Sequence, residues 1–406
     1  MKLTDQVSQR NFKAFLWHAA FLALAKNFMD VDTIIPAMVI DAGGNSVHIG
    51  LLTAILVGVS KMAQFFFAPW LQNKERKKGY LLLGVNTRVF SLLGMALLFF
   101  FSGDMTESTV LLLIFFFITI FSVSGSFSNI SYTDILGKSI WQEKRKSFFS
   151  IRQVISNIGV FVSALLAAKI LLVTGYPSNY SILFFIAAGC LLVASLGFWY
   201  AREIPVKGLQ ISGVISFFSE IRREFRTNRK FVHYLWMVNT LGISITLLPF
   251  LVLYAKEVFD AGNDAVGGFL LFKVAGSVLA GAVLFYGSSR ITYQSMLYVI
   301  ATMSFLMPVL LFLLPSISLF FLLFIAGGII FAMEQVVVNG VLLEVSSNQN
   351  RAFYAGLAGV GNILPALFPL LSGWVISVWG FPVFFGIYMG IIAASYYFIY
   401  RLDCKA

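Results

Sequence analysis

The chain has 406 residues, of which 59% are hydrophobic and only 12% charged, with a formal net charge of +11. A soluble protein carries about 25% charged residues, so this composition excludes an ordinary soluble domain. The basic residues lie between long apolar stretches instead of forming one surface patch, and this distribution argues against nucleic acid as a partner.

Twelve apolar stretches, each long enough to cross a bilayer, follow one another along the chain. A helix needs about 20 apolar residues to cross the hydrocarbon core, and backbone polar groups in lipid must be satisfied within the segment. We therefore predict an all-α membrane protein with twelve transmembrane helices. The expected spans are 12–40, 48–71, 79–101, 109–136, 148–174, 181–201, 230–255, 265–287, 293–314, 318–345, 353–379 and 382–400.

Lysine and arginine gather at alternate connections between these spans. The connections 2–13, 74–78, 138–146 and 202–230 are strongly basic, whereas 104–107 and 257–264 are mainly acidic. Basic loops face the cytoplasm, so we expect the N- and C-termini there and the basic excess against anionic lipid. The prediction is a multi-pass protein of the cell inner (cytoplasmic) membrane.

The one long hydrophilic connection divides the chain into two halves. We expect an N-terminal six-helix bundle over 1–201, a cytoplasmic linker with an amphipathic helix over 202–229, and a C-terminal six-helix bundle over 230–406. The halves are weakly similar: a shift of 205 places Lys146-Ser147-Phe148-Phe149 on Arg351-Ala352-Phe353-Tyr354, and Asn157 on Asn362. Two parallel six-helix repeats are typical of secondary transporters that rock around a midplane site.

Three local motifs resemble the major facilitator superfamily. Residues 68–77 occupy the place of G-x-x-x-D-R-x-G-R-R; they keep the final basic pair, Arg76 and Lys77, but have Gln72 at the Asp position. Glu344 and Arg351 resemble an E-x6-R relay of sugar porters, and Asp32-Thr33-Ile34-Ile35-Pro36 resembles a stretch of drug antiporters. The last two motifs point to different subfamilies, so neither assigns a substrate.

The resemblance implies a bacterial twelve-helix transporter that works by alternating access. It also implies a set of charged residues near the inner ends of the helices that gates the cytoplasmic side. The expected gating residues are Arg76, Lys77, Asp134, Arg145, Glu344 and Arg351.

Charged residues within the spans are expensive to insert and therefore indicate function. Arg88 lies about 14 Å into its span, too deep to reach the surface easily, so it either pairs with a carboxylate such as Asp30 or contacts an anionic substrate. Lys26 and Asp30 share one helix face and form either a structural pair or a titratable switch. We expect the substrate site to include Lys26, Lys61, Arg88, Asn129, Asn157, Gln335 and Asn362.

Glu334 is the one deep carboxylate of the second half. It is either a proton carrier or the partner of a lysine or arginine on another helix. The expected proton-coupling residues are Asp30, Asp32 and Glu334.

Other chemistry is missing from the sequence. It contains no phosphate-binding loop, no nucleophile–base arrangement and no metal-ligand spacing, so we expect neither an enzyme nor a cofactor. We predict a monomeric secondary active transporter that couples a small organic solute to protons, in symport. Six deep basic residues against three acidic ones favour an anionic or zwitterionic solute. The alternatives are an exporter or flippase of drugs or amphiphiles, and a transporter-like receptor or assembly factor.

Overall fold

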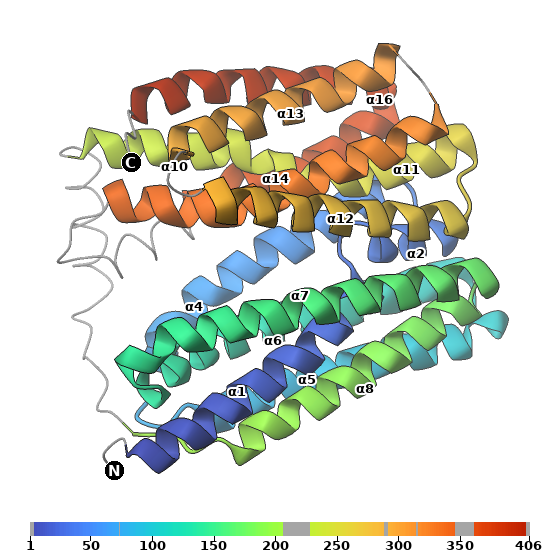
Figure 1. Ribbon diagram of the computed structural model, residues 1–406. Helices are drawn as coiled ribbons and strands as arrows, with labels where there is room; N and C mark the ends of the chain where they lie inside the picture. The colour runs from blue at the N-terminus through green and yellow to red at the C-terminus, as the bar shows by residue number, and fades with distance from the viewer. Residues whose placement is uncertain are drawn as a thin grey trace. The chain divides into compact units, whose positions relative to one another are not determined.

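The computed structural model describes residues 4–72, 74–205, 228–287, 291–313, 316–345 and 361–402. All regular structure in these ranges is helical (Figure 1). The chain forms two compact units, one of Met1–Gly43 with Val59–Ile211 and one of Gly44–Gly58 with Ser212–Ala406. Most of the expected linker, residues 206–227, lies outside the described ranges, so its amphipathic helix stays a prediction.

The first unit is a bundle in which α5 packs against α6 and α8, and α1 packs against α7 and α8 (Figure 1). Its helices are α1 (Asp5–Lys26), α2 (Ile34–Asp41), α4 (Ser60–Gln72), α5 (Lys78–Phe100), α6 (Glu107–Ser139), α7 (Gln142–Val173) and α8 (Ser178–Tyr200).

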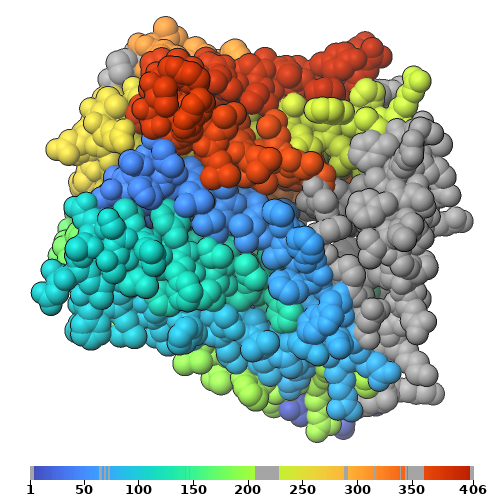
Figure 2. Space-filling model, turned by 180° about the vertical axis from the view of Figure 1, so that it is seen from behind, coloured from blue at the N-terminus to red at the C-terminus, as the bar shows by residue number. Residues whose placement is uncertain are grey.

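The second unit is built in the same way, with α12 against α14, α13 against α14 and α16, and α10 against α16. Its helices are α3 (Ser46–Ala54), α10 (Arg229–Leu241), α11 (Leu247–Phe259), α12 (Asn263–Gly287), α13 (Tyr293–Leu313), α14 (Ile317–Val345) and α16 (Ile363–Leu402). Helix α16 is drawn in orange-red to red in Figure 2. Its exposed aromatic side chains include those of Trp374, Trp379, Tyr397 and Tyr400.

Residues 44–58 precede the linker in sequence, yet they group with the second unit. Glycines explain the contact. A Cβ on Gly50 would lie 2.4 Å from the Pro369 carbonyl oxygen, and one on Gly373 would lie 2.4 Å from the Ser46 carbonyl oxygen. Helices α3 and α16 therefore touch backbone to backbone, as membrane helices do through small residues.

Ten helices within the described residues are long and apolar enough to cross a membrane. Helix α16 has 40 residues, about 60 Å of helix and twice the thickness of a hydrocarbon core. Gly380 interrupts it with a φ of 78°. Helix α16 therefore contains the expected last span together with most of the span before it. The expected total of twelve stays a prediction.

The first expected span, 12–40, is not one continuous helix. After α1 the chain forms the short 3-10 helix Asn27–Met29, and α2 begins at Ile34. Asp30 stabilises this break: its Oδ1 accepts hydrogen bonds from the amides of Asp32 (3.1 Å) and Thr33 (2.9 Å) and from the Thr33 hydroxyl (2.8 Å). The two amides precede the first residue of α2, so the Asp30 side chain holds the turn between the two helices by bonding its own local backbone.

Helices α12 and α14 also meet backbone to backbone. A Cβ on Gly328 would lie 1.9 Å from the Lys273 carbonyl oxygen, and one on Gly276 would lie 2.1 Å from that of Ile325. The Ser277 hydroxyl donates to the Gly328 carbonyl at 3.0 Å across the same contact. Side chains larger than hydrogen at these two glycines would push the helices apart.

We expect Gly328→Ala to destabilise the protein by about 1–3 kcal/mol, because overpacking of a close contact forces backbone shifts. Thermal unfolding of the purified protein in detergent measures the loss. Gly390→Ala is the matched control, since a Cβ there meets no atom within 4 Å. Equal unfolding temperatures for the two variants would contradict a tight α12–α14 contact.

Candidate functional site

Four helices of the first unit bring basic and aromatic side chains together. His18 of α1 is buried, with Nδ1 3.2 Å from the Ala194 carbonyl oxygen and its ring centroid 3.9 Å from that of Phe198. The Tyr132 ring of α6 lies 6.0 Å from the His18 ring, and the guanidinium carbon of Arg152, on α7, lies 5.9 Å from the Tyr132 centroid. We call His18, Arg88, Tyr132 and Arg152 the basic cluster.

Arg88 of α5 packs against an aromatic ring. Its guanidinium carbon lies 4.1 Å from the centroid of the Phe121 ring. Gly125 leaves room for this arrangement, because a Cβ there would lie 3.4 Å from the Arg88 Nε. That Nε is buried, and among the described residues no atom accepts a hydrogen bond from it.

The basic cluster contains two positively charged arginines and no carboxylate. The positive charges of Arg88 and Arg152 both act on the His18 imidazole. None of the ion pairs formed between described residues includes either arginine. A buried cation without a carboxylate partner carries a desolvation cost that an anionic ligand would relieve.

The sequence analysis missed three members of this cluster. His18 and Tyr132 have no distinctive spacing, and Arg152 lies near enough to the inner end of its span to be interpreted as reaching the surface. Only the packing of α1, α6 and α7 places them beside one another. The signal in the sequence was the depth of Arg88 alone.

The remaining expected site residues of the first unit do not contact this cluster in any described interaction. The side chains of Lys26, Lys61, Asn129 and Asn157 are exposed. Asn157 accepts a hydrogen bond from Gln153 Nε2 at 2.8 Å, so both side chains lie on the face of α7 that carries exposed residues.

In the second unit, Glu334 of α14 lies near two buried tyrosines. Its charge acts on the hydroxyl groups of Tyr234, on α10, and Tyr388, on α16. Tyr234 donates a hydrogen bond to the Val338 carbonyl at 3.2 Å, which holds it against α14. Lys273 of α12 is also buried, with its ammonium 5.8 Å from the ring centroid of Phe331, one turn before Glu334.

Gln335 and Asn362 occupy different surroundings from Glu334. The Gln335 side chain is exposed. Asn362 lies just before α16, where its neighbour in space, Asn239, donates to the Gly361 carbonyl at 2.6 Å and accepts from the Leu364 amide at 2.8 Å. The Asn362 Oδ1 is buried, and no described donor reaches it.

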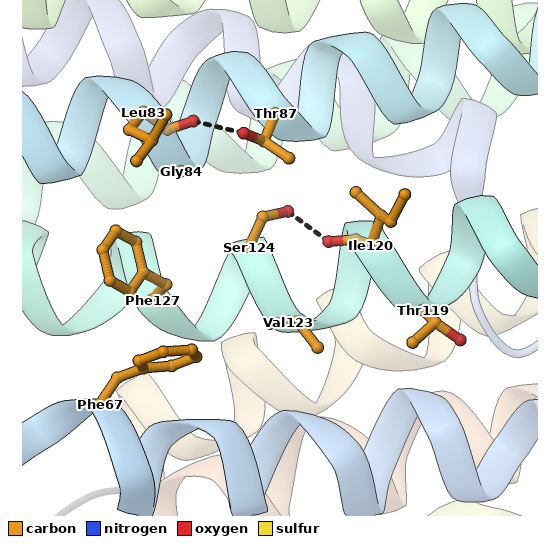
Figure 3. A pocket seen from close by; sticks show the side chains of 9 residues that line it. All are labelled: Phe67, Leu83, Gly84, Thr87, Thr119, Ile120, Val123, Ser124 and Phe127. Atoms are coloured by element: carbon orange, nitrogen blue, oxygen red, sulfur yellow. Dashed lines mark hydrogen bonds between the residues drawn. The ribbon is translucent and has the colours of Figure 1, made fainter.

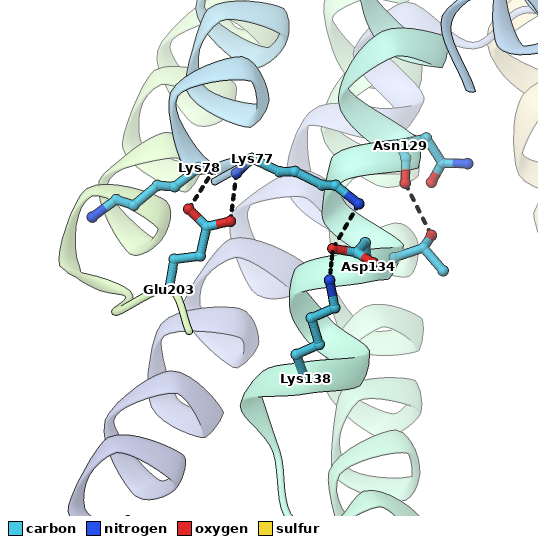
Figure 4. A network of polar contacts seen from close by, with 7 residues as sticks. Lys77, Lys78, Asn129, Asp134, Lys138 and Glu203 are labelled. Atoms are coloured by element: carbon cyan, nitrogen blue, oxygen red, sulfur yellow. Dashed lines mark hydrogen bonds and ion pairs between the residues drawn. The ribbon is translucent and has the colours of Figure 1, made fainter. Parts of the chain in front are cut away.

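Charged side chains form a network at the end of the first unit where α5 begins and α6 ends (Figure 4). Asp134 of α6 pairs with the ammonium groups of Lys77, at 3.1 Å, and Lys138, at 2.6 Å. Arg145 donates to the carbonyls of Ile140, at 3.2 Å, and Gly137 at the end of α6. Arg76 is exposed, while Arg351 and the side chain of Glu344 lie outside the described residues.

Glu203 fixes the start of α5. Its two carboxylate oxygens accept hydrogen bonds from the backbone amides of Lys77 and Lys78, the latter at 2.9 Å (Figure 4). The loop lacks the expected aspartate at position 72, and a carboxylate from 126 residues further along the chain satisfies the start of this helix instead. A carboxylate at a helix start also interacts favourably with the helix dipole.

We expect Glu203→Ala to cost about 1–2 kcal/mol of stability, because it removes a charged acceptor from two amides at a helix start. The unfolding temperature in detergent reports the loss. Glu75→Ala serves as control, since Glu75 is an exposed acid of the neighbouring loop. A Glu203 variant as stable as the Glu75 variant would show that the cap has no energetic weight.

Comparisons with known proteins agree on one family. A sequence profile described as Major Facilitator Superfamily matches residues 16–362. No curated protein matches the chain in sequence. Solved structures similar in fold include a mutant of the nucleoside transporter NupG, with a TM-score of 0.68 and 16% identity over 97% of this chain and 100% of that one.

Two further structures share the fold at low identity. A POT family transporter in complex with a thioalcohol-conjugated peptide has a TM-score of 0.68 and 12% identity over 97% of this chain and 95% of that one. A D-xylose-proton symporter has a TM-score of 0.65 and 14% identity over 96% of this chain and 97% of that one.

Proposed function

Because this chain belongs to the Major Facilitator Superfamily, and is a multi-pass membrane transporter and not an enzyme, we propose that it moves a small organic anion or zwitterion. The observation that carries this proposal is the buried Arg88 Nε, which has no acceptor among the described residues. Transport by alternating access between the halves 1–201 and 230–406, across the cytoplasmic membrane and as a monomer, is part of the same proposal.

The basic cluster provides the charge that an anionic group would need. Arg88 offers a planar guanidinium whose hydrogen-bond donors match a carboxylate or phosphate. Arg152 adds a second positive charge, and the His18 imidazole lies within electrostatic range of both. In a low-dielectric wall such charges act more strongly than they would in water.

The other expected binding residues keep a place in this proposal as later contacts along the pathway. Lys26, Lys61, Asn129 and Asn157 have exposed side chains that a solute could reach. Gln335 and Asn362 are the corresponding candidates of the second unit. The solved relatives in fold carry names with different solutes, a nucleoside, a peptide and a sugar, so we propose a charge class and no individual compound.

Proton coupling is proposed through Glu334, Asp30 and Asp32. Glu334 lies about 16 Å from the inner end of α14, within a membrane-spanning helix where ionisable groups mark proton relays. The Asp30 carboxylate caps the break in the first span, so protonation there would loosen the join between α1 and α2. A proton symporter among the structural relatives supports this assignment.

Gating of the inner side is proposed for the network around Asp134. Lys77 of the loop joins α6 through Asp134, and Arg145 binds the carbonyls at the end of the same helix. Arg76, Glu344 and Arg351 complete the proposed set. The Lys77 side chain is buried and those of Asp134 and Lys138 are partly exposed, so opening this network during the cycle would return the Lys77 ammonium to water.

A thermal-shift screen of purified protein against a panel of solutes tests the proposal. A solute at 100 times its dissociation constant stabilises a protein by about 2.7 kcal/mol. We expect anionic or zwitterionic compounds to raise the unfolding temperature in a concentration-dependent way. Stabilisation by cationic compounds alone would contradict the proposed charge class.

A further inference from the structure

An open hollow of about 370 Å³ lies between α4, α5 and α6, and its lining includes no member of the basic cluster (Figure 3). Phe67, Leu83 and Phe127 lie at one end and Thr119 at the other, with Thr87 and Val123 between them (Figure 3). Its size falls within the range of about 300–1,000 Å³ that small-molecule sites have.

The lining offers no free hydroxyl to a polar ligand. Thr87 donates to the Leu83 carbonyl at 2.8 Å and Ser124 to that of Ile120 at 2.6 Å (Figure 3). Thr119 donates to the Phe115 carbonyl at 2.7 Å. Each hydroxyl thus donates its proton within its own helix, so the lining presents mainly methyl groups and aromatic rings to a ligand. The chemistry of the lining fits an aliphatic chain.

The hollow opens on a surface of α5 that suits lipid. Leu83, Phe90 and Leu97 are spaced seven residues apart and are 60%, 64% and 46% exposed. Leu83 and Thr87 lie about 7.5 and 13.5 Å along α5 from Lys78, so this part of the lining lies in one half of a core about 30 Å thick. The charge pattern predicts that this half is the cytoplasmic one.

An aromatic and basic rim continues the hollow towards the membrane surface. The Trp70 ring centroid lies 6.1 Å from that of Phe127 and 5.0 Å from that of Tyr80. The Lys74 ammonium lies 5.1 Å from the Trp70 centroid, and Arg76 is exposed in the same loop. Aromatic rings with basic side chains mark the headgroup level of a bilayer.

The neighbouring lysines of this loop are already engaged. The Lys77 ammonium pairs with Asp134 at 3.1 Å. The Lys78 ammonium donates to the carbonyls of Trp199 and Ala201, both at 2.8 Å. Lys74 and Arg76 are therefore the cations of this loop that are available to bind an external anion.

We infer that the groove between α4, α5 and α6 binds one anionic phospholipid, with an acyl chain against Leu83 and Phe127 and the headgroup at Lys74 and Arg76. The apolar lining binds the acyl chain, and the basic rim favours a negatively charged headgroup. This inference does not depend on the proposed substrate class, because the groove shares no residue with the basic cluster. Only Arg76 belongs both to this site and to the proposed gating set.

Native mass spectrometry of the full-length protein in detergent, titrated with dioleoyl phosphatidylglycerol or dioleoyl phosphatidylcholine, tests the inference. Each basic residue near the membrane surface is expected to favour the anionic lipid about fivefold. The first phosphatidylglycerol should therefore bind at least tenfold more tightly than phosphatidylcholine. The double variant Lys74→Gln, Arg76→Gln should lose this preference, and Lys13→Gln, at an exposed lysine of α1, should keep it.

Filling the groove tests the acyl-chain half of the inference. Leu83→Trp should weaken the first phosphatidylglycerol about tenfold, whereas Leu97→Trp, on the same exposed face but outside the groove, should bind as wild type. Thr87→Phe fills the groove from another position if Leu83→Trp does not fold. Equal binding of the two lipids by wild type, or unchanged binding after the groove is filled, would show bulk lipid contact only and overturn the inference.

Discussion

Arg88→Gln is expected to abolish binding of the anionic solute while leaving the free protein as stable as wild type, or more stable. Removing one partner of a buried charge-assisted contact costs about 2–5 kcal/mol, which corresponds to an affinity loss of about 30-fold or more. The Arg88 Nε has no acceptor among the described residues, so neutralising this charge removes a desolvation cost and breaks no described ion pair.

Two readouts separate this result from a structural role for Arg88. Isothermal titration measures affinity, and thermal unfolding measures the free protein. If Arg88 were half of a buried ion pair, its loss would destabilise the protein by about 3–5 kcal/mol. That destabilisation, together with unchanged anion affinity, would refute a substrate role.

Two further variants sharpen the comparison. Arg88→Lys keeps the charge but loses the planar fork, so a bidentate contact should still weaken severely. Arg10→Gln is the matched control, because Arg10 also stacks on a ring, 4.0 Å from the Tyr200 centroid, and donates to the Tyr200 carbonyl at 2.8 Å. It lies near the N-terminal end of α1, and its loss should leave anion affinity unchanged.

Glu334→Gln is expected to abolish accumulation driven by a proton gradient and to spare exchange of solute without a gradient. Glutamine has nearly the same shape but cannot release a proton, so coupling is lost while the pathway remains. Proteoliposomes with and without an imposed pH difference measure the two activities. Loss of a general acid–base group slows a reaction by about 100-fold or more. We expect the gradient-driven rate of transport to fall by at least about tenfold.

Glu257→Gln controls for the loss of an acid from the same unit, since Glu257 is exposed near the end of α11. Asp30→Asn, examined in the same assay, keeps an oxygen that can accept the cap hydrogen bonds, so the break in the first span should persist. If the Glu334 and Asp30 variants both retained full pH-dependent transport, the coupling site would lie elsewhere.

Much of the fold follows from the sequence because lipid allows few alternatives. Apolar stretches of about 20 residues must be helical, so the positions of helices such as α5 and α8 were predicted within a few residues. The break at Asp30 was not predicted, because the apolar stretch continues through Pro36 and hides a local cap. The contact between Gly328 and Lys273 depends on which helices pack together, and no local pattern contains that information.

The candidate site, like the fold, could be predicted only in part from the sequence. The depth of Arg88 could be counted along its span, and its Nε is buried in the structure; its role in binding stays a prediction. Its neighbours could not be predicted, because His18, Tyr132 and Arg152 come from three other helices and meet only on packing. The cap that Glu203 forms at the start of α5 could not be predicted either, because a contact across 126 residues leaves no pattern in the local sequence of either segment.

The most direct test of anion transport is uptake by proteoliposomes of three solutes matched in size, one anionic, one neutral and one cationic, with a more acidic exterior. We predict accumulation of the anionic solute above its external concentration, its loss when the pH difference is collapsed, and its loss in Arg88→Gln. Accumulation of the cationic solute, or binding of the anion without any movement across the membrane, would contradict the proposal.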